Sequence, residues 1–185
     1  MNEPVYPNGT PLKDFIQPGD VLFQSGKGLV SKLIRTFTDG KVNHALLAYD
    51  STQSFETDGE WLKAGFHELP KVTEKGNIII RPMYLTDVNR PYLQELCRKY
   101  EGVPYDFWDC ATNALFSWLK DNLRERLLTI IGTKRLMKCD ELVSRILYET
   151  CDRKELKLYE GLNPQRLLQI MLETYPQYQI LYWNP

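Results

Sequence analysis

The sequence predicts an α+β protein with an antiparallel sheet. Three observations carry this prediction: short runs of β-branched and aromatic residues fill the first half, apolar residues at helical spacing fill the second, and Pro and Gly separate the runs. The length of 185 residues suits one domain, residues 1–185, with a substantial core. The content of 43% hydrophobic and 25% charged residues is typical of globular proteins.

Strand signals occur mainly before residue 85. The runs at 42–49 and 54–57 are joined by a polar segment, which predicts an antiparallel hairpin with His44 and Glu56 on its two arms. The unbroken apolar run at 78–80 predicts a central strand that is buried on both faces. The expected strands cover residues 21–24, which follow the turn Gln17-Pro18-Gly19-Asp20, and residues 42–49, 54–57, 77–84 and 178–183.

Helix signals dominate the rest of the chain. Pro91 suits a first helical turn, and Asn163 before Pro164 is a typical N-cap. A helix that begins at Cys139 carries Asp140 in its first turn, where a carboxylate complements the helix dipole. The expected helices cover residues 28–38, 91–102, 139–151 and 164–175, with an added helical segment at about 107–132.

Charge and cysteine usage narrow the classes of partner. Lys and Arg total 23 against 24 Asp and Glu, a net charge of -1, so we expect no nucleic-acid partner. No window is apolar enough to span a bilayer, and the first residues lack a secretory signal, so a cytoplasmic or virion-associated location is the default expectation. Cys97, Cys110, Cys139 and Cys151 form no C-x-x-C pair, so we expect free thiols, no metal and no other cofactor.

Cys139 is the candidate nucleophile. A helix N-terminus favours the thiolate, whereas Cys97 and Cys151 fall late in expected helices and Cys110 is flanked by apolar residues. The alternative for Cys139 is a buried packing cysteine, which is the usual role of a free thiol.

A thiol nucleophile needs a base, and histidine suits that role near neutral pH. The chain has two histidines: His44 lies in a strand, and His67 lies in a looser, more polar segment, so we select His44. Glu56 on the partner arm of the hairpin is the candidate for orienting the imidazole, ahead of Asp50 in the connecting turn. The alternatives are a hydrogen-bonded core or edge histidine and a solvated strand-end carboxylate.

In chain order, the motifs PGDVLF, NHALLAY with SFET, YEGVPYD and KCDELV resemble the circularly permuted NlpC-like papain-fold hydrolases. The resemblance covers about residues 18 to 147 and implies a sheet packed against the nucleophile helix. It implies Cys139 as nucleophile, His44 as base and Glu56 as orienting group, and it matches Tyr105 to a tyrosine that helps to stabilise the oxyanion. Two features depart from the family pattern. Asp140 replaces the small residue that usually follows the cysteine, and the stretch between Tyr105 and Cys139 is long.

The activity implied by this resemblance is that of a cysteine amidase or peptidase that hydrolyses a small peptide or a cell-wall-type amide through a thioester. Two alternatives stay open. One is a thiol acyltransferase similar to the lecithin:retinol acyltransferase relatives, acting on lipid or protein acceptors. The other is a binding module without catalysis on the same fold. The substrate and the oligomeric state are not defined by the sequence.

Overall fold

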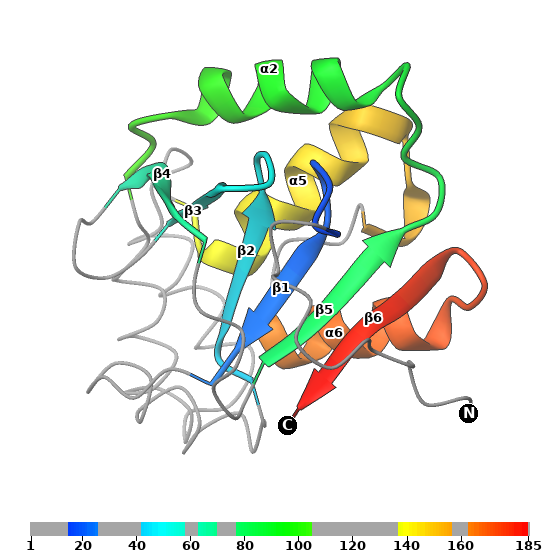
Figure 1. The fold of residues 1–185 in the computed structure, drawn as a ribbon. Coiled ribbons are helices and arrows are strands. Elements are labelled where there is room, and N and C mark those ends of the chain that lie inside the picture. Colours follow the sequence, from blue (N-terminus) through cyan, green and yellow to red (C-terminus); the bar gives the residue numbers. More distant parts are fainter. Residues whose placement is uncertain are drawn as a thin grey trace, which may run out of the picture.

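The computed structural model describes residues 15–25, 42–57, 63–69, 77–104, 137–156 and 163–184. Within these residues the protein is α+β, with a six-stranded antiparallel sheet in the order β4-β3-β2-β1-β5-β6 (Figure 1). The strands are β1 (Val21–Gln24), β2 (His44–Ala48), β3 (Gln53–Thr57), β4 (Ala64–Glu68), β5 (Asn77–Pro82) and β6 (Tyr178–Asn184).

The predicted hairpin is confirmed as β2 and β3, which pair antiparallel with Leu47 opposite Phe55. The predicted strand around Ile79 is also confirmed as β5, although it lies between β1 and β6 and is therefore next to the edge of the sheet. Its apolar run is unbroken because both faces of the sheet are buried. Ile78 and Ile80 belong to one apolar cluster, and Ile79 belongs to the cluster on the other face.

Strand β4 was not predicted from the sequence. The segment that holds Gly65 and His67 looks polar and loose, yet it pairs with β3 along its whole length. The Phe66 ring explains the difference, because its centroid lies 4.9 Å from that of Phe55 and 4.8 Å from that of Tyr49. Aromatic packing and pairing with β3 therefore outweigh the weak strand propensity of the segment.

Three α-helices and a 3₁₀ turn are described: α2 (Arg90–Tyr100), α5 (Cys139–Cys151), η2 (Lys154–Leu156) and α6 (Pro164–Glu173). For the three described α-helices, the expected starts are confirmed to within one residue. Asn163 Oδ1 accepts a hydrogen bond from the backbone N–H of Arg166 at 2.8 Å, and a proline occupies the first turn of α2. Helix α5 packs against β2 and β3 on the face opposite the viewer (Figure 1), and α2 packs against α5.

The turn before β1 is fastened to the sheet by a buried ion pair. Asp20 is 1% exposed, and its carboxylate accepts two hydrogen bonds from Arg81, at 2.8 and 2.7 Å. Gly19 has a φ of +93°, and a Cβ atom there would lie 2.1 Å from Leu85 Cδ1. The Pro-Gly-Asp turn therefore requires glycine for its conformation and for space.

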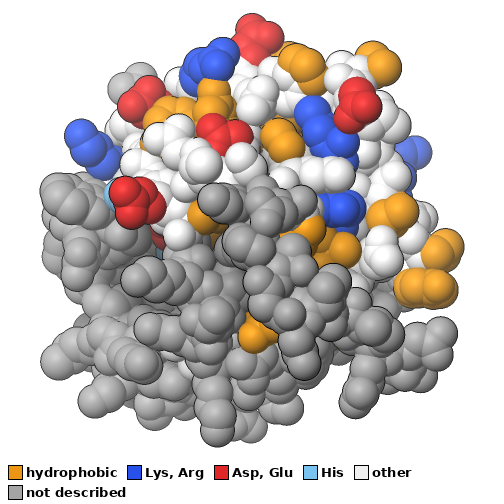
Figure 2. Space-filling view, viewed as in Figure 1, with side chains coloured by type: hydrophobic (Ala, Val, Ile, Leu, Met, Phe, Trp, Pro, Cys, Tyr) orange, Lys and Arg blue, Asp and Glu red, His pale blue; other side chains and the backbone are white. Residues whose placement is uncertain are grey.

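Four sequence predictions lie outside the described residues: the helix at 28–38, the added helical segment at 107–132, Tyr105 and Cys110. On the face shown in Figure 2, acidic and basic side chains of the described residues are interspersed rather than gathered by sign. None of the described helices has the length and apolar character that crossing a bilayer demands.

Candidate active site

His44 and Glu56 meet across the β2–β3 hairpin. His44 is the first residue of β2, and Glu56 is the penultimate residue of β3. The His44 Nε2 atom lies 2.5 Å from Glu56 Oε2, which is the distance of a short, charge-assisted hydrogen bond. The two side chains are 19% and 12% exposed. The orienting role that the sequence assigns to Glu56 therefore has the contact it needs.

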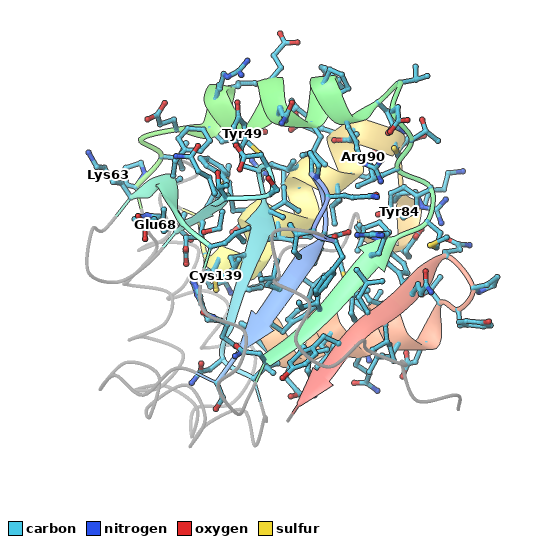
Figure 3. All side chains as sticks on the ribbon, in the orientation of Figure 1. Tyr49, Lys63, Glu68, Tyr84, Arg90 and Cys139 are labelled. Carbon is cyan, nitrogen blue, oxygen red and sulfur yellow. The ribbon has the colours of Figure 1, made fainter. Side chains whose placement is uncertain are left out.

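Cys139 approaches the same histidine from the helix layer. It is the first residue of α5, and it is 3% exposed. Figure 3 shows Cys139 at the start of α5 beside β2 and β3, away from Tyr84 and Arg90. The charge of Cys139 acts on the His44 ring and raises the pKa of that histidine, so the sulfur lies close to the imidazole. Since Glu56 occupies Nε2, we infer that Nδ1 faces the sulfur. The three predicted residues are therefore brought together.

The electrostatics of this group favour charged forms. Burial alone would lower the pKa of His44, but the charge and hydrogen bond of Cys139, followed by those of Glu56, raise this pKa well above 6.5. Burial alone would raise the pKa of Glu56, but the His44 hydrogen bond and charge, with help from Ser54 and His67, lower it below 4.5. These two shifts favour a protonated His44 ring beside an ionised Glu56 carboxylate.

Two residues that were not predicted as site residues also act on Glu56, one through a hydrogen bond and the other through its charge. The Ser54 hydroxyl donates to Glu56 Oε1 at 3.0 Å, and the charge of His67 helps to lower the pKa of Glu56. Ser54 could have been found from the sequence, since residues two apart on a strand share a face. His67 could not, because its strand was not recognised.

The other described cysteines lack this setting. Cys97 is fully buried, and burial raises the pKa of its thiol to about 12. Cys151 is the last residue of α5, and burial raises the pKa of its thiol above 9.0 although Arg153 opposes that shift. This agrees with the sequence expectation that both are packing cysteines. All three described cysteines are free thiols.

Asp140 is more buried than its place in the first turn of a helix leads one to expect. The sequence places it in the first turn of α5 as a carboxylate that complements the helix dipole, and it is there, but it is only 1% exposed. Its Oδ1 atom lies 3.9 Å from the Cys139 sulfur. The residue after Cys139 is thus a buried polar neighbour of the sulfur.

No group of three or more His, Cys, Asp or Glu residues within the described ranges is arranged to hold a metal ion. In this site Glu56 Oε2 occupies the Nε2 side of the His44 ring, and the charge of Cys139 acts on the same ring.

Comparison with known proteins gives a likeness of fold. No family profile matches the chain, and no curated protein matches it. Among solved structures, the metalloprotein yiiX from Escherichia coli O157:H7, DUF1105, superimposes with a TM-score of 0.53 and 19% sequence identity, covering 89% of this chain and 87% of that one. At this identity the two proteins are alike in fold.

Proposed function

We propose that this chain is a cysteine-dependent amidase or peptidase, built as a single circularly permuted papain-like domain of the NlpC-like type. The observation that carries the proposal is the meeting of a helix-start cysteine with a histidine that is hydrogen-bonded to a carboxylate. This is the arrangement expected of an activated thiol nucleophile. A small peptide or a cell-wall-type amide is the proposed substrate.

In the first half of the reaction, the Cys139 thiolate attacks the carbonyl carbon of the amide. The C–S bond forms, the carbonyl oxygen becomes an oxyanion, and the C–N bond then breaks. The His44 imidazolium gives its proton to the departing nitrogen, which leaves as a free amine. The products of this half are a thioester on Cys139 and a neutral imidazole on His44.

In the second half, water attacks the thioester carbonyl and His44 takes the proton. The C–S bond breaks, the carboxylic acid leaves, and the thiolate and imidazolium are restored. Glu56 keeps the ring oriented and stabilises its positive charge in both halves. The first turn of α5 presents backbone N–H groups that have no partner within the helix, and these suit an oxyanion beside the sulfur. We propose Tyr105 as an additional donor.

The test is whether purified protein hydrolyses peptidoglycan fragments, lysine-containing amides and acyl esters. Hydrolysis is measured as the release of amine or alcohol. Cys139→Ala and His44→Asn should each lower kcat/KM by at least about a thousandfold. Cys151→Ala is the matched control, because it removes a thiol from the other end of the same helix. Circular dichroism confirms that each variant is folded. Hydrolysis that survives in Cys139→Ala at the wild-type rate would refute the proposal.

Intact-mass spectrometry separates the two alternatives from the proposal. A Cys139 acyl adduct that is discharged by water supports the hydrolase. An adduct that persists until a lipid or protein acceptor is added supports the acyltransferase. A protein that binds these ligands and never forms an adduct is a binding module. Elemental analysis of the same sample shows whether any metal accompanies activity.

A further inference from the structure

The carboxylate of Glu56 is held at both of its oxygens. Oε2 lies against His44, and Oε1 accepts a hydrogen bond from the Ser54 hydroxyl at 3.0 Å. Ser54 is fully buried, at 0% exposure, and it lies two residues before Glu56 on β3. Alternation along a strand places both side chains on one face of the sheet. The hydroxyl is therefore fixed relative to the carboxylate by the strand itself.

The next strand supports the same carboxylate from the side. In the β3–β4 pairing, Ser54 lies opposite His67, and Glu56 lies opposite Gly65. A Cβ atom on Gly65 would lie 3.6 Å from His67 Nε2, so the His67 ring leans along β4 over the glycine. This lean carries the ring towards Glu56. The charge of His67 accordingly helps to lower the pKa of Glu56.

We propose that Ser54 is a positioning residue of the catalytic group: its hydroxyl fixes the rotation of the Glu56 carboxylate, so that Oε2 stays on His44 Nε2 while Nδ1 faces Cys139. The inference rests on the proposed function for its consequence in catalysis. Its structural basis is the pair of hydrogen bonds to one carboxylate, from Ser54 and from His44.

A physical reason supports this role. A carboxylate with a single hydrogen-bonded oxygen can rotate about its last bond, whereas one held at both oxygens has its plane defined. Glu56 is also buried, so a lost donor leaves an oxygen that water replaces poorly. Without Ser54, the carboxylate should spend less time on His44, and the ring should lose part of the contact that keeps it charged and oriented.

The test compares Ser54→Ala with Ser144→Ala. Ser144 is likewise 0% exposed, but its hydroxyl donates to the backbone carbonyl of Glu141 within α5. The pKa of His44 is measured by side-chain ¹H–¹⁵N spectra across pH. The chain has two histidines, so a His67→Gln sample assigns the signals. Glu56→Gln gives the value without the carboxylate.

In Ser54→Ala, the pKa of His44 should fall towards its value in Glu56→Gln, and the pKa of Glu56 should rise. For a substrate that the wild type hydrolyses, kcat should fall by about tenfold with KM unchanged, the loss expected for one hydrogen bond to a charged group. Ser144→Ala should retain the wild-type pKa of His44 and the wild-type kcat. If Ser54→Ala does not fold, Ser54→Thr, which keeps the hydroxyl, is compared with Ser54→Val, which has the same shape without it.

Failure of this inference is distinct from failure of the proposed function. A wild type that hydrolyses amides while Ser54→Ala matches Ser144→Ala in His44 pKa and kcat overturns the positioning role alone. A wild type with no turnover overturns the proposed function. In that case the titration still decides whether Ser54 holds Glu56 on His44, because it needs no substrate.

Discussion

Alkylation of the thiols at decreasing pH tests the pairing of Cys139 with His44 directly. A thiol reacts as thiolate, so its rate follows the thiolate fraction. Burial keeps the pKa of Cys151 above 9.0, so its thiolate fraction is at most about 1% at pH 7 and about 0.01% at pH 5. The alkylation rate of Cys151 should therefore fall about a hundredfold over this range.

Cys139 should behave differently. The pKa of His44 lies well above 6.5, so its ring stays positively charged between pH 7 and pH 5, and a cation beside a thiol favours the thiolate form. The Cys139 rate should therefore fall far less, and the ratio of the Cys139 rate to the Cys151 rate should rise by up to about a hundredfold. The ratio is the useful quantity, because the two sulfurs differ in exposure and nucleophilicity, and these factors are the same at both pH values.

The assay is brief treatment with iodoacetamide, followed by peptide mass mapping to measure the modified fraction at each cysteine. His44→Gln is the matched perturbation, because it removes the cation and leaves Cys139 at the start of α5. In that variant the Cys139 rate should fall with pH much as Cys151 does. Equal hundredfold falls at both cysteines in the wild-type protein would refute the paired state.

Three further predictions concern stability. Gly19→Ala should cost about 2–4 kcal/mol in chemical denaturation, because the new Cβ meets a leucine side chain and φ is positive. Arg81→Met leaves Asp20 buried without its cation and should cost about 3–5 kcal/mol, measured the same way; a wild-type midpoint would contradict this. The stabilisation from the raised pKa of His44 is complete below pH 6.5, and it is lost as the pH rises through the pKa of His44 in the folded protein. The stabilisation from the lowered pKa of Glu56 is complete above pH 4.5, and it is lost as the pH falls through the pKa of Glu56 in the folded protein. Stability measured against pH should therefore show the full contribution of both groups between about pH 4.5 and 6.5. Glu56→Gln should remove the contribution of Glu56 and reduce that of His44, and the part due to Cys139 should remain.

The parts of the site that were predictable depend on local signals. A helix that starts at Cys139 is visible from its acidic first turn and its apolar period, and the hairpin is visible from two β-like runs around a polar turn. Placing His44 and Glu56 on the two arms followed from the hairpin alone. The position of Cys139 beside the hairpin depends on tertiary packing, which no local signal predicts. That position was expected from the resemblance to a known order of motifs.

The parts that were missed depend on contacts between distant residues. The strand that holds His67 is made by pairing with β3 and by aromatic packing of Phe66, and neither is visible in a segment that contains glycine and charged residues. The burial of Asp140 was missed for a similar reason, because a carboxylate in a first helical turn is usually solvated and this one is covered by distant residues. Ser54 was within reach, since strand alternation places it beside Glu56.

A carboxylate as the third group has a consequence for the leaving group. An ionised Glu56 stabilises the imidazolium more than a neutral amide would, which makes His44 a stronger base and its protonated form a weaker acid. A departing amine nitrogen is basic enough to take a proton from this weaker acid. A departing alkoxide depends less on protonation, so it gains less from the imidazolium. In the proposed mechanism, the hydrogen-bonded carboxylate therefore strengthens the thiolate–imidazolium pair at little cost to amide cleavage. For this reason we propose that the pairing of His44 with Glu56 favours an amide over an ester as the substrate.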